Sequence, residues 1–394
     1  MFFGAGFVFP RIPEIHFGVG KLAQLPGLVR ARGDALLLVT GSASFRGSAH
    51  FAALEKEFRA CGIRFEIESF AGEPSPDFVD DVASRFRRRN FDWVVAVGGG
   101  SAIDAGKAIS AMLPQEGSVR DFLEGQATRQ HDGRKVPFVA VPTSSGTGAE
   151  ATKNAVLSVV GPAGFKNSLR HDNFMPDIAL VDPELTRSCP PAVTAACGLD
   201  ALTQLIEAYV STKASPLTDA LALSGLESIG RGFLPAVERG ESDLAARSHM
   251  AYAALMSGIA LANAGLGLVH GFAGPIGGCC PMPHGEVCGT LLGEVTRRTV
   301  AALLADEEGQ GLALAKYARV GALLSGRSAG NVREDCGRLV ETLEAWIAQT
   351  GMPRLGRYGI TAGDFDRILD QSNGKNSPAV LAREEMRAIL AARL

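Results

Sequence analysis

The sequence lacks the features that mark exported and nucleic-acid-binding proteins. Its first residues, MFFGAGFVFPRIPEI, contain neither a basic leader nor an apolar segment long enough for an export signal. Cysteine is scarce: there are seven, an odd number, and no C-x-x-C pair, which is typical of a reduced protein. No block of Lys or Arg could grip a phosphate backbone, and the net charge is only -3. We therefore expect a cytoplasmic protein that binds no nucleic acid.

One long segment lacks Asp, Glu, Lys and Arg altogether. It runs between His249 and Glu286 and is long enough to cross a bilayer. However, it contains Asn263, His270, Pro275 and many glycines, and no aromatic belt flanks it. We interpret it as a buried core helix followed by a glycine-rich loop, and we expect no membrane span.

Apolar runs alternate with stretches of helical spacing in the first half of the chain. A parallel sheet buried on both faces produces such runs, because helices cover each side of it. This alternation predicts an α/β fold with a parallel sheet and helices on both faces. The apolar runs cover residues 35–40, 91–97, 136–141 and 178–181, and helical spacing appears between them at 51–61 and 78–88.

Beyond residue 190 the pattern changes. Strand-like runs fade, and Ala- and Leu-rich stretches of helical spacing take over, as in 216–231 and 332–349. The chain has 394 residues, more than a single core usually holds. We therefore expect an α/β domain over residues 1–190 and an all-α domain over residues 191–394.

Two polar turns follow predicted strands. Three glycines at 98–100 come directly after an apolar run and open a helical stretch. Without Cβ atoms the backbone can approach a ligand closely, and the free N–H groups at a helix start favour a pyrophosphate. A second turn, 142–148, brings hydroxyls and glycines to the edge where ligands of open α/β sheets bind. The alternative, a glycine-rich turn without chemical role, is weakened by this second turn.

Three further side chains, Asp200, His270 and His284, could bind a divalent metal. Asp200 and Gln204 are four residues apart and share a helix face. His270 and His284 are separated by thirteen residues rich in Gly and Pro, so they cannot lie on one continuous helix, but they can converge with His270 ending one helix and His284 opening the next. One carboxylate and two imidazoles suit a divalent ion. A lone His in an apolar segment is more often a hydrogen-bonded core residue, so spacing alone leaves the metal open.

Five segments, in this order, resemble the motifs of iron-containing alcohol dehydrogenases. They are GGGSAIDAGKAIS, PTSSGTGAEAT, PDIALVDPELT, GLDALTQLIEAYVS and VHGFAGPIGGCCPMPHGEVC. The resemblance covers nearly the whole chain and implies a dehydroquinate synthase-like architecture, with a Rossmann-like dinucleotide-binding domain followed by an all-α domain. It also implies an NAD(P)-dependent alcohol dehydrogenase, or aldehyde or ketone reductase, in which iron or zinc polarises the oxygen of a small substrate. Such a protein is expected to be a homodimer or a higher homo-oligomer.

Residue by residue, the resemblance implies a cofactor set and a metal set, and it identifies no catalytic acid. The metal set is Asp200, Gln204, His270 and His284. The cofactor set is Gly41, Gly98, Gly99, Gly100, Ser101, Asp104, Thr143, Ser144, Thr147 and Lys166.

The sequence departs from the family pattern at two imidazole positions. Most members have His where this chain has Gln204, and many have a further His where it has Gly274. An amide oxygen is a weaker donor than imidazole for iron or zinc, so we expect an ion that is weakly bound or absent. Cys279 or Cys280 could supply a thiolate instead, but adjacent cysteines rarely point to one centre, and buried cysteine is mostly packing.

The residues after the strand at 36–40 bear on cofactor choice. Members that prefer NAD often carry an Asp there, whereas this chain has Gly41-Ser42-Ala43-Ser44. Without an acid to repel a 2′-phosphate, we expect NADP(H) to be accepted at least as well as NAD(H).

Three other functions stay open from the sequence. The first is a metal-independent reductase similar to the maleylacetate reductases. The second is a lyase similar to 3-dehydroquinate synthase, which gives no net oxidation. The third is a relative that binds the cofactor without catalysis.

Overall fold

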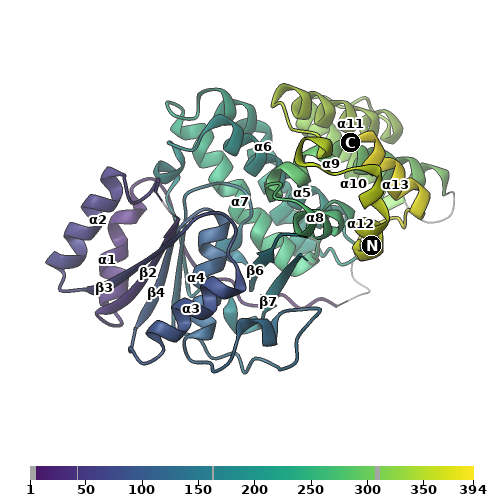
Figure 1. Cartoon of the computed structure of the whole chain (residues 1–394). Coiled ribbons are helices and arrows are strands. Elements are labelled where there is room, and N and C mark those ends of the chain that lie inside the picture. Colours follow the sequence, from purple (N-terminus) through teal and green to yellow (C-terminus); the bar gives the residue numbers. More distant parts are fainter. Residues whose placement is uncertain (1–5, 42, 162–163, 307–310) are drawn as a thin grey trace. The chain divides into compact units, whose positions relative to one another are not determined.

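The computed structural model describes residues 6–394 except 42, 162–163 and 307–310. These residues form two compact units, which can be followed by their colours in Figure 1. The α/β unit comprises Pro10–Val159 and Lys166–Cys189. The helical unit comprises Pro190–Leu394 with the described residues of Met1–Phe9 and Val160–Phe165.

The α/β unit is built on a parallel sheet of six strands among the described residues, in the order β1-β8-β5-β4-β2-β3. The apolar runs predicted as strands correspond to β2, β4, β5 and β8, and the predicted Rossmann-like sheet is confirmed. The prediction did not include β1 or β3, which lie at the two edges and alternate with polar residues. The strands are β1 (Glu14–Phe17), β2 (Ala35–Gly41), β3 (Arg64–Phe70), β4 (Trp93–Gly98), β5 (Phe138–Pro142) and β8 (Ile178–Val181).

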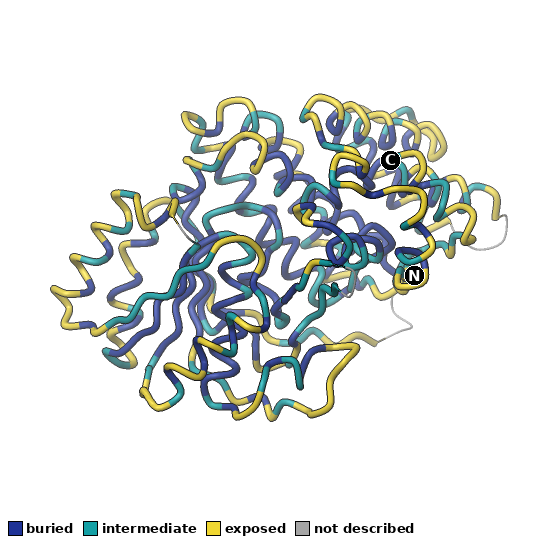
Figure 2. Tube along the Cα trace, viewed as in Figure 1, coloured by how far each residue is buried: buried dark blue, intermediate teal, exposed yellow. Residues whose placement is uncertain are grey.

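Helices cover the two faces of this sheet. On one face, α1 and α2 share a core with Leu36 and Leu38 of β2. On the other face, α4 packs on β2, β4 and β5, and α3 packs against α4. A Cβ on Gly106 of α4 would lie 2.7 Å from the Cβ of Ala96, so glycine lets this helix lie close to β4. Figure 2 shows the central strands buried and the outer surfaces of α1 and α2 exposed. The helices are α1 (Leu25–Arg30), α2 (Ala49–Ala60), α3 (Pro76–Phe86) and α4 (Gly100–Met112).

Shorter elements complete the α/β unit. Strands β6 (Asn154–Val159) and β7 (Phe165–Arg170) form a separate two-stranded sheet, and β6 packs against α4. The 3-10 helices are η1 (Lys21–Gln24), η2 (Val119–Phe122), η3 (Ala149–Ala151), η4 (Asp172–Phe174) and η5 (Pro183–Thr186).

The helical unit is organised around α5, which packs against α6, α7 and α9. Nearly every residue of α5 from Thr194 onward is buried, so the polar side chains on this helix need partners inside the core. Its described helices are α5 (Pro191–Val210), α6 (Pro216–Arg239), α7 (Leu244–Ala264), α8 (Leu268–Cys279), α9 (His284–Ala305), α10 (Gly311–Ser325), α11 (Val332–Gln349), η6 (Leu355–Tyr358), η7 (Ala362–Asp364), α12 (Phe365–Gln371) and α13 (Arg383–Ala392).

The prediction of a glycine-rich loop after α7 is wrong, because residues Leu268–Cys279 form α8. Its glycines serve close packing: a Cβ on Gly271 would lie 1.9 Å from the carbonyl oxygen of Asn373. His270 is therefore the third residue of α8. The expectation that His270 ends a helix is wrong. Among the described residues no single helix is long and apolar enough to cross a membrane; α7 and α8 meet those criteria only as a pair bent by 99°.

Candidate functional site

The two polar turns of the α/β unit lie in contact with each other. The backbone N–H of Thr143 donates to the carbonyl of Gly98 over 2.9 Å, which ties the end of β5 to the end of β4. A Cβ on Gly100 would lie 2.6 Å from Oγ1 of Thr147. Since only glycine leaves room for that hydroxyl, the two turns form one polar surface at the start of α4.

Four more residues of the predicted cofactor set lie at the same place. A Cβ on Gly99 would meet Oγ of Ser144 at 3.3 Å, and one on Gly98 would lie 3.5 Å from the backbone nitrogen of Gly41. Ser101 is the second residue of α4 and is partly exposed. The carboxyl ends of β2, β4 and β5 therefore meet at one edge of the sheet, where open α/β folds bind ligands.

Asp104 and Lys166 add charge to this region. Burial raises the pKa of Asp104 to about 6, against the opposing effects of Lys107 and Lys166. The Lys166 ammonium lies 3.1 Å from a carboxylate oxygen of Glu73, which also acts on Asp104. The carboxyl group of Asp104 and the ammonium group of Lys166 thus lie close enough to interact electrostatically beside α4.

Lys107, by contrast, has a structural role. Its ammonium donates to the carbonyls of Ala149 and Asn154, both over 2.8 Å, and to Oγ1 of Thr152 over 3.1 Å. The side chain is 1% exposed. It therefore joins α4 to the segment after the second turn and is not available to a phosphate.

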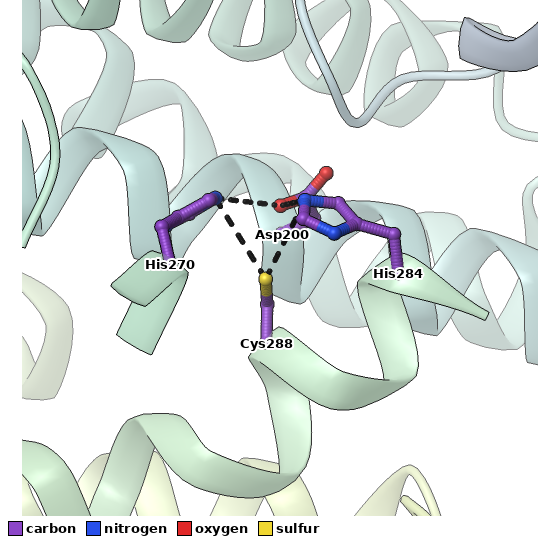
Figure 3. Close-up of side chains that lie close together, drawn as sticks. All are labelled: Asp200, His270, His284 and Cys288. Carbon is purple, nitrogen blue, oxygen red and sulfur yellow. Dashed lines mark hydrogen bonds and ion pairs between the residues drawn. The ribbon is translucent and has the colours of Figure 1, made fainter. Parts of the chain in front are cut away.

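Four side chains of the helical unit converge on one point. They come from three helices: Asp200 from α5, His270 from α8, and His284 and Cys288 from α9 (Figure 3). Oδ1 of Asp200 lies 3.4 Å from Nε2 of His270 and 3.6 Å from Nε2 of His284. Sγ of Cys288 lies 3.7 Å from each of these nitrogens. We call these four residues the donor cluster.

The electrostatics of the donor cluster suit a cation. Oδ1 of Asp200 is buried, and no group among the described residues gives it a well-formed hydrogen bond. Burial raises the pKa of Asp200, but the two imidazoles outweigh this, and the pKa is lowered overall. Burial raises the pKa of Cys288 to about 12, so this thiol is neutral when no ion is present. A buried carboxylate oxygen without a donor, facing two imidazoles and a thiol, fits a divalent metal ion.

Glu207 binds the second ring nitrogen of His270, and this role was not predicted from the sequence. Its Oε2 lies 2.7 Å from Nδ1 of His270, and its Oε1 accepts from the backbone N–H of Val269 over 2.7 Å. A carboxylate in this position fixes the tautomer and orientation of the ring, so that Nε2 points toward Asp200. The sequence signal was present, since Glu207 and Asp200 are seven residues apart on one helix face.

Gln204 is buried on α5, but another group engages its amide. Oγ of Ser257 on α7 donates to Oε1 of Gln204 over 2.7 Å. The two cysteines considered in the sequence analysis are also engaged elsewhere: Cys279 accepts from Arg367 over 3.1 Å, and Cys280 lies 3.5 Å from the carbonyl of Ile276. The sulfur that reaches the two histidines is that of a third cysteine, which the sequence analysis did not identify.

Close packing of α9 on α5 brings the donor cluster together. A Cβ on Gly285 would lie 2.5 Å from the carbonyl oxygen of Ala196, and one on Gly289 would lie 2.9 Å from Cδ1 of Leu199. Because both positions are glycine, the first turns of α9 lie against the α5 backbone, and His284 reaches Asp200.

Comparison with known proteins places both units in one family. Residues 13–183 match the model of the iron-containing alcohol dehydrogenases, and residues 194–394 match that of the C-terminal part of the Fe-containing alcohol dehydrogenase family. Long-chain-alcohol dehydrogenase 1 of Geobacillus thermodenitrificans is 34% identical over 98% of this chain and 95% of that protein. The NADPH-dependent butanol dehydrogenase of Clostridium saccharobutylicum is 32% identical over 97% of this chain and 96% of that protein.

A solved structure supports the same relationship. The crystal structure of a 1,3-propanediol oxidoreductase has a TM-score of 0.88 to this chain at 30% identity, covering 99% of this chain and 100% of that one. The similarity therefore extends over the α/β unit and the helical unit.

Proposed function

The chain belongs to the iron-containing alcohol dehydrogenase family, and we propose that it interconverts primary alcohols and aldehydes with NAD(P) and a divalent metal ion. The observation that carries this proposal is the donor cluster, in which a buried carboxylate oxygen of Asp200 has no good hydrogen-bond donor among the described residues.

The α/β unit would bind the cofactor. The backbone at Gly98, Gly99 and Gly100 would approach the pyrophosphate, since the N–H groups at the start of α4 favour an anion. Hydroxyls of Thr143, Ser144, Thr147 and Ser101, with Gly41, Asp104 and Lys166, would complete the site.

The helical unit would hold the ion through Asp200, His270 and His284. When bound, the ion supplies Lewis-acid polarisation of the substrate oxygen, and the nicotinamide donates or accepts the hydride. Glu207 holds Nδ1 of His270, so that Nε2 stays directed toward Asp200. Burial of Asp200 keeps its carboxylate out of water, which strengthens its attraction for a cation.

We further propose that NADP(H) is accepted at least as well as NAD(H). Gly41 at the end of β2 is followed by Ser42-Ala43-Ser44, none of which is an acid. Ser42 lies outside the described residues. The exposed Arg46 donates to Oγ of Ser69 on β3 over 3.4 Å, so a cation lies near the carboxyl ends of β2 and β3. An arginine at this edge of a dinucleotide-binding sheet accommodates a 2′-phosphate. The Clostridium relative, described as NADPH-dependent, agrees with this preference.

The proposed substrate class rests on two residues of α8. Gly274, four residues after His270, is partly exposed and carries no side chain, whereas Phe272 is fully buried in the core. We therefore propose a pocket that admits alcohols longer than ethanol. The Geobacillus relative is described as acting on long-chain alcohols, which supports this substrate class.

A steady-state assay tests the proposal. The purified protein would be stripped of metal, reloaded with Zn²⁺ or Fe²⁺, and supplied with primary alcohols of increasing length and NAD⁺ or NADP⁺. We expect metal-dependent formation of the reduced cofactor, with kcat/KM rising beyond two carbons. Equal turnover by the stripped protein would favour the metal-independent reductase instead. Tight cofactor binding without turnover of any alcohol or aldehyde would favour the non-catalytic relative.

Assembly and location stay predictions from the sequence. We propose a homodimer or higher homo-oligomer in the cytoplasm. Light scattering of the purified protein and fractionation of the source cells would test the two statements.

A further inference from the structure

We propose that Cys288 is a thiolate ligand of the metal ion and takes the place of the imidazole that position 204 lacks. The inference rests on the proposed function, because it concerns the same metal site. It changes the ligand set from the expected Asp200, Gln204, His270 and His284 to Asp200, His270, His284 and Cys288.

The spacing of the donor atoms matches a tetrahedral ion. With bonds of usual length to zinc, the edges of a tetrahedron are about 3.4 Å between nitrogen and oxygen and about 3.6 Å between sulfur and nitrogen. The observed edges are 3.4 and 3.6 Å from Asp200 to the two imidazoles, and 3.7 Å from Cys288 to each of them. All four donor atoms lie within 4.8 Å of one another. These four contacts place the sulfur where a fourth ligand to an ion held by the other three residues would lie.

The local structure fixes the sulfur in that position. Cys288 is one helical turn after His284 on α9, so the two side chains project from the same face (Figure 3). The residue is fully buried. Because the close contact of Gly285 with Ala196 holds the start of α9 against α5, the backbone of Cys288 cannot move away from the cluster without displacing the helix.

Gln204 is a poorer candidate for the fourth ligand. Its amide oxygen already accepts a hydrogen bond of 2.7 Å from Ser257. To bind the ion, this oxygen would have to share or lose that bond, and a neutral amide is in any case a weak donor for late first-row metals. A thiolate is both charged and softer.

Binding of the ion would release one proton. A coordinated divalent cation would take the thiol of Cys288 as a thiolate, so that an S–metal bond would replace the S–H bond and the proton would go to solvent. The resulting set, two imidazoles, one carboxylate and one thiolate, selects zinc, cobalt or iron over magnesium and manganese. Catalytic zinc can expand to five ligands, so four protein donors still leave access for a substrate oxygen.

Cobalt substitution tests the ligand directly. The full-length protein would be stripped of metal and titrated with Co²⁺ while its absorption spectrum is recorded. We expect an intense near-ultraviolet thiolate-to-cobalt charge-transfer band that saturates at one ion per chain. In Cys288→Ser the band should disappear, and the affinity for Zn²⁺ should fall at least about 10-fold because one ligand is lost.

Two variants serve as controls. Cys336→Ser removes another buried cysteine of the helical unit, whose thiol lies 3.5 Å from the carbonyl of Leu314, and it should leave the band unchanged. Gln204→Leu removes the amide and should also leave the band and the Zn²⁺ affinity nearly unchanged. The inference is overturned if Co²⁺ binds without the band, if the band persists in Cys288→Ser, or if only Gln204→Leu weakens Zn²⁺ binding.

The outcomes separate this inference from the proposed function. Metal-dependent alcohol oxidation without a thiolate band would leave the function intact and reject Cys288 as a ligand. A thiolate band in wild type, lost in Cys288→Ser, in a protein that oxidises no alcohol would support the ligand and reject the function.

Discussion

The two units build their candidate sites by opposite means. In the α/β unit the site consists largely of backbone in short turns that follow the strands, and its key positions are glycines that leave space. In the helical unit the site consists of side chains from α5, α8 and α9, and its key positions are the donors themselves. The site in the α/β unit depends on glycines that have no Cβ atom. The site in the helical unit depends on which oxygen, nitrogen and sulfur atoms its side chains carry. They should therefore respond differently to substitution.

Removal of a donor should have the largest effect and be confined to the helical unit. We expect His284→Ala to lose metal and to reduce kcat/KM by at least about 10³-fold, because Lewis-acid polarisation contributes several kcal/mol. The dissociation constant of NAD(P)H should change less than about 2-fold, a difference below ~0.4 kcal/mol. Metal analysis, steady-state kinetics and fluorescence titration of the cofactor measure the three quantities. His50→Ala, which removes an exposed imidazole on α2, is the control. If His284→Ala also lost affinity for NAD(P)H, the metal site and the cofactor site would not be independent.

Loss of the support behind the donors should have a smaller effect. Glu207→Gln keeps an acceptor for His270 but removes its charge, and such changes lower metal affinity by about 10- to 100-fold. Competition with a chromophoric chelator would measure the affinity, and thermal melting would compare the metal-free proteins. The matched control is Glu227→Gln on the exposed face of α6, which should change neither. If the metal-free variant melted far below wild type, Glu207 would act on stability rather than on the metal.

A single added methyl group should damage the other site. In Gly100→Ala the Cβ would lie 2.6 Å from Oγ1 of Thr147, so the turn must shift. Overpacking of this kind costs about 1–3 kcal/mol, and if the cost falls on the bound state the affinity for NAD(P)H is weaker by roughly 5- to 160-fold. Metal content should be unchanged. Gly27→Ala in α1, where a Cβ would meet nothing within 4 Å, is the control. Unchanged cofactor affinity in Gly100→Ala would show that this turn does not bind the cofactor.

The smallest expected effect concerns cofactor choice. Arg46 is exposed, and exposed ion pairs contribute up to about 1 kcal/mol, so Arg46→Ala should raise KM for NADP⁺ about 5-fold. KM for NAD⁺ should stay the same, because NAD⁺ has no 2′-phosphate. Arg59→Ala, on α2 and paired with Glu55, controls for loss of a surface charge. An equal rise for both cofactors would mean that Arg46 does not recognise the phosphate.

Most of the α/β unit could be predicted from the sequence. The strands β2, β4, β5 and β8 are continuous apolar runs because helices cover both faces of the sheet. The edge strand β3, RFEIESF, has only partly buried residues and alternates with charge, so it resembles many exposed segments. Its role as a strand depends on pairing with β2, which no local pattern reveals.

The helical unit was less predictable in detail. Glycine and proline in α8 predicted a loop, since both are weak helix formers. Tertiary packing overrides this preference, because contacts such as that of Gly271 with Asn373 require a helix without a side chain there. The shift moved His270 from the end of one helix to the start of another.

The sequence by itself determined the family, the doubly wound sheet and three members of the donor cluster, Asp200, His270 and His284. These follow from ordered motifs, apolar runs and residue types, all of which are local properties of the chain. Only the tertiary structure decided that the sulfur of Cys288 lies within 3.7 Å of both imidazoles and that Ser257 engages Gln204. Those contacts depend on how closely α9 and α7 approach α5, and helix separation is set by the packing of many distant side chains.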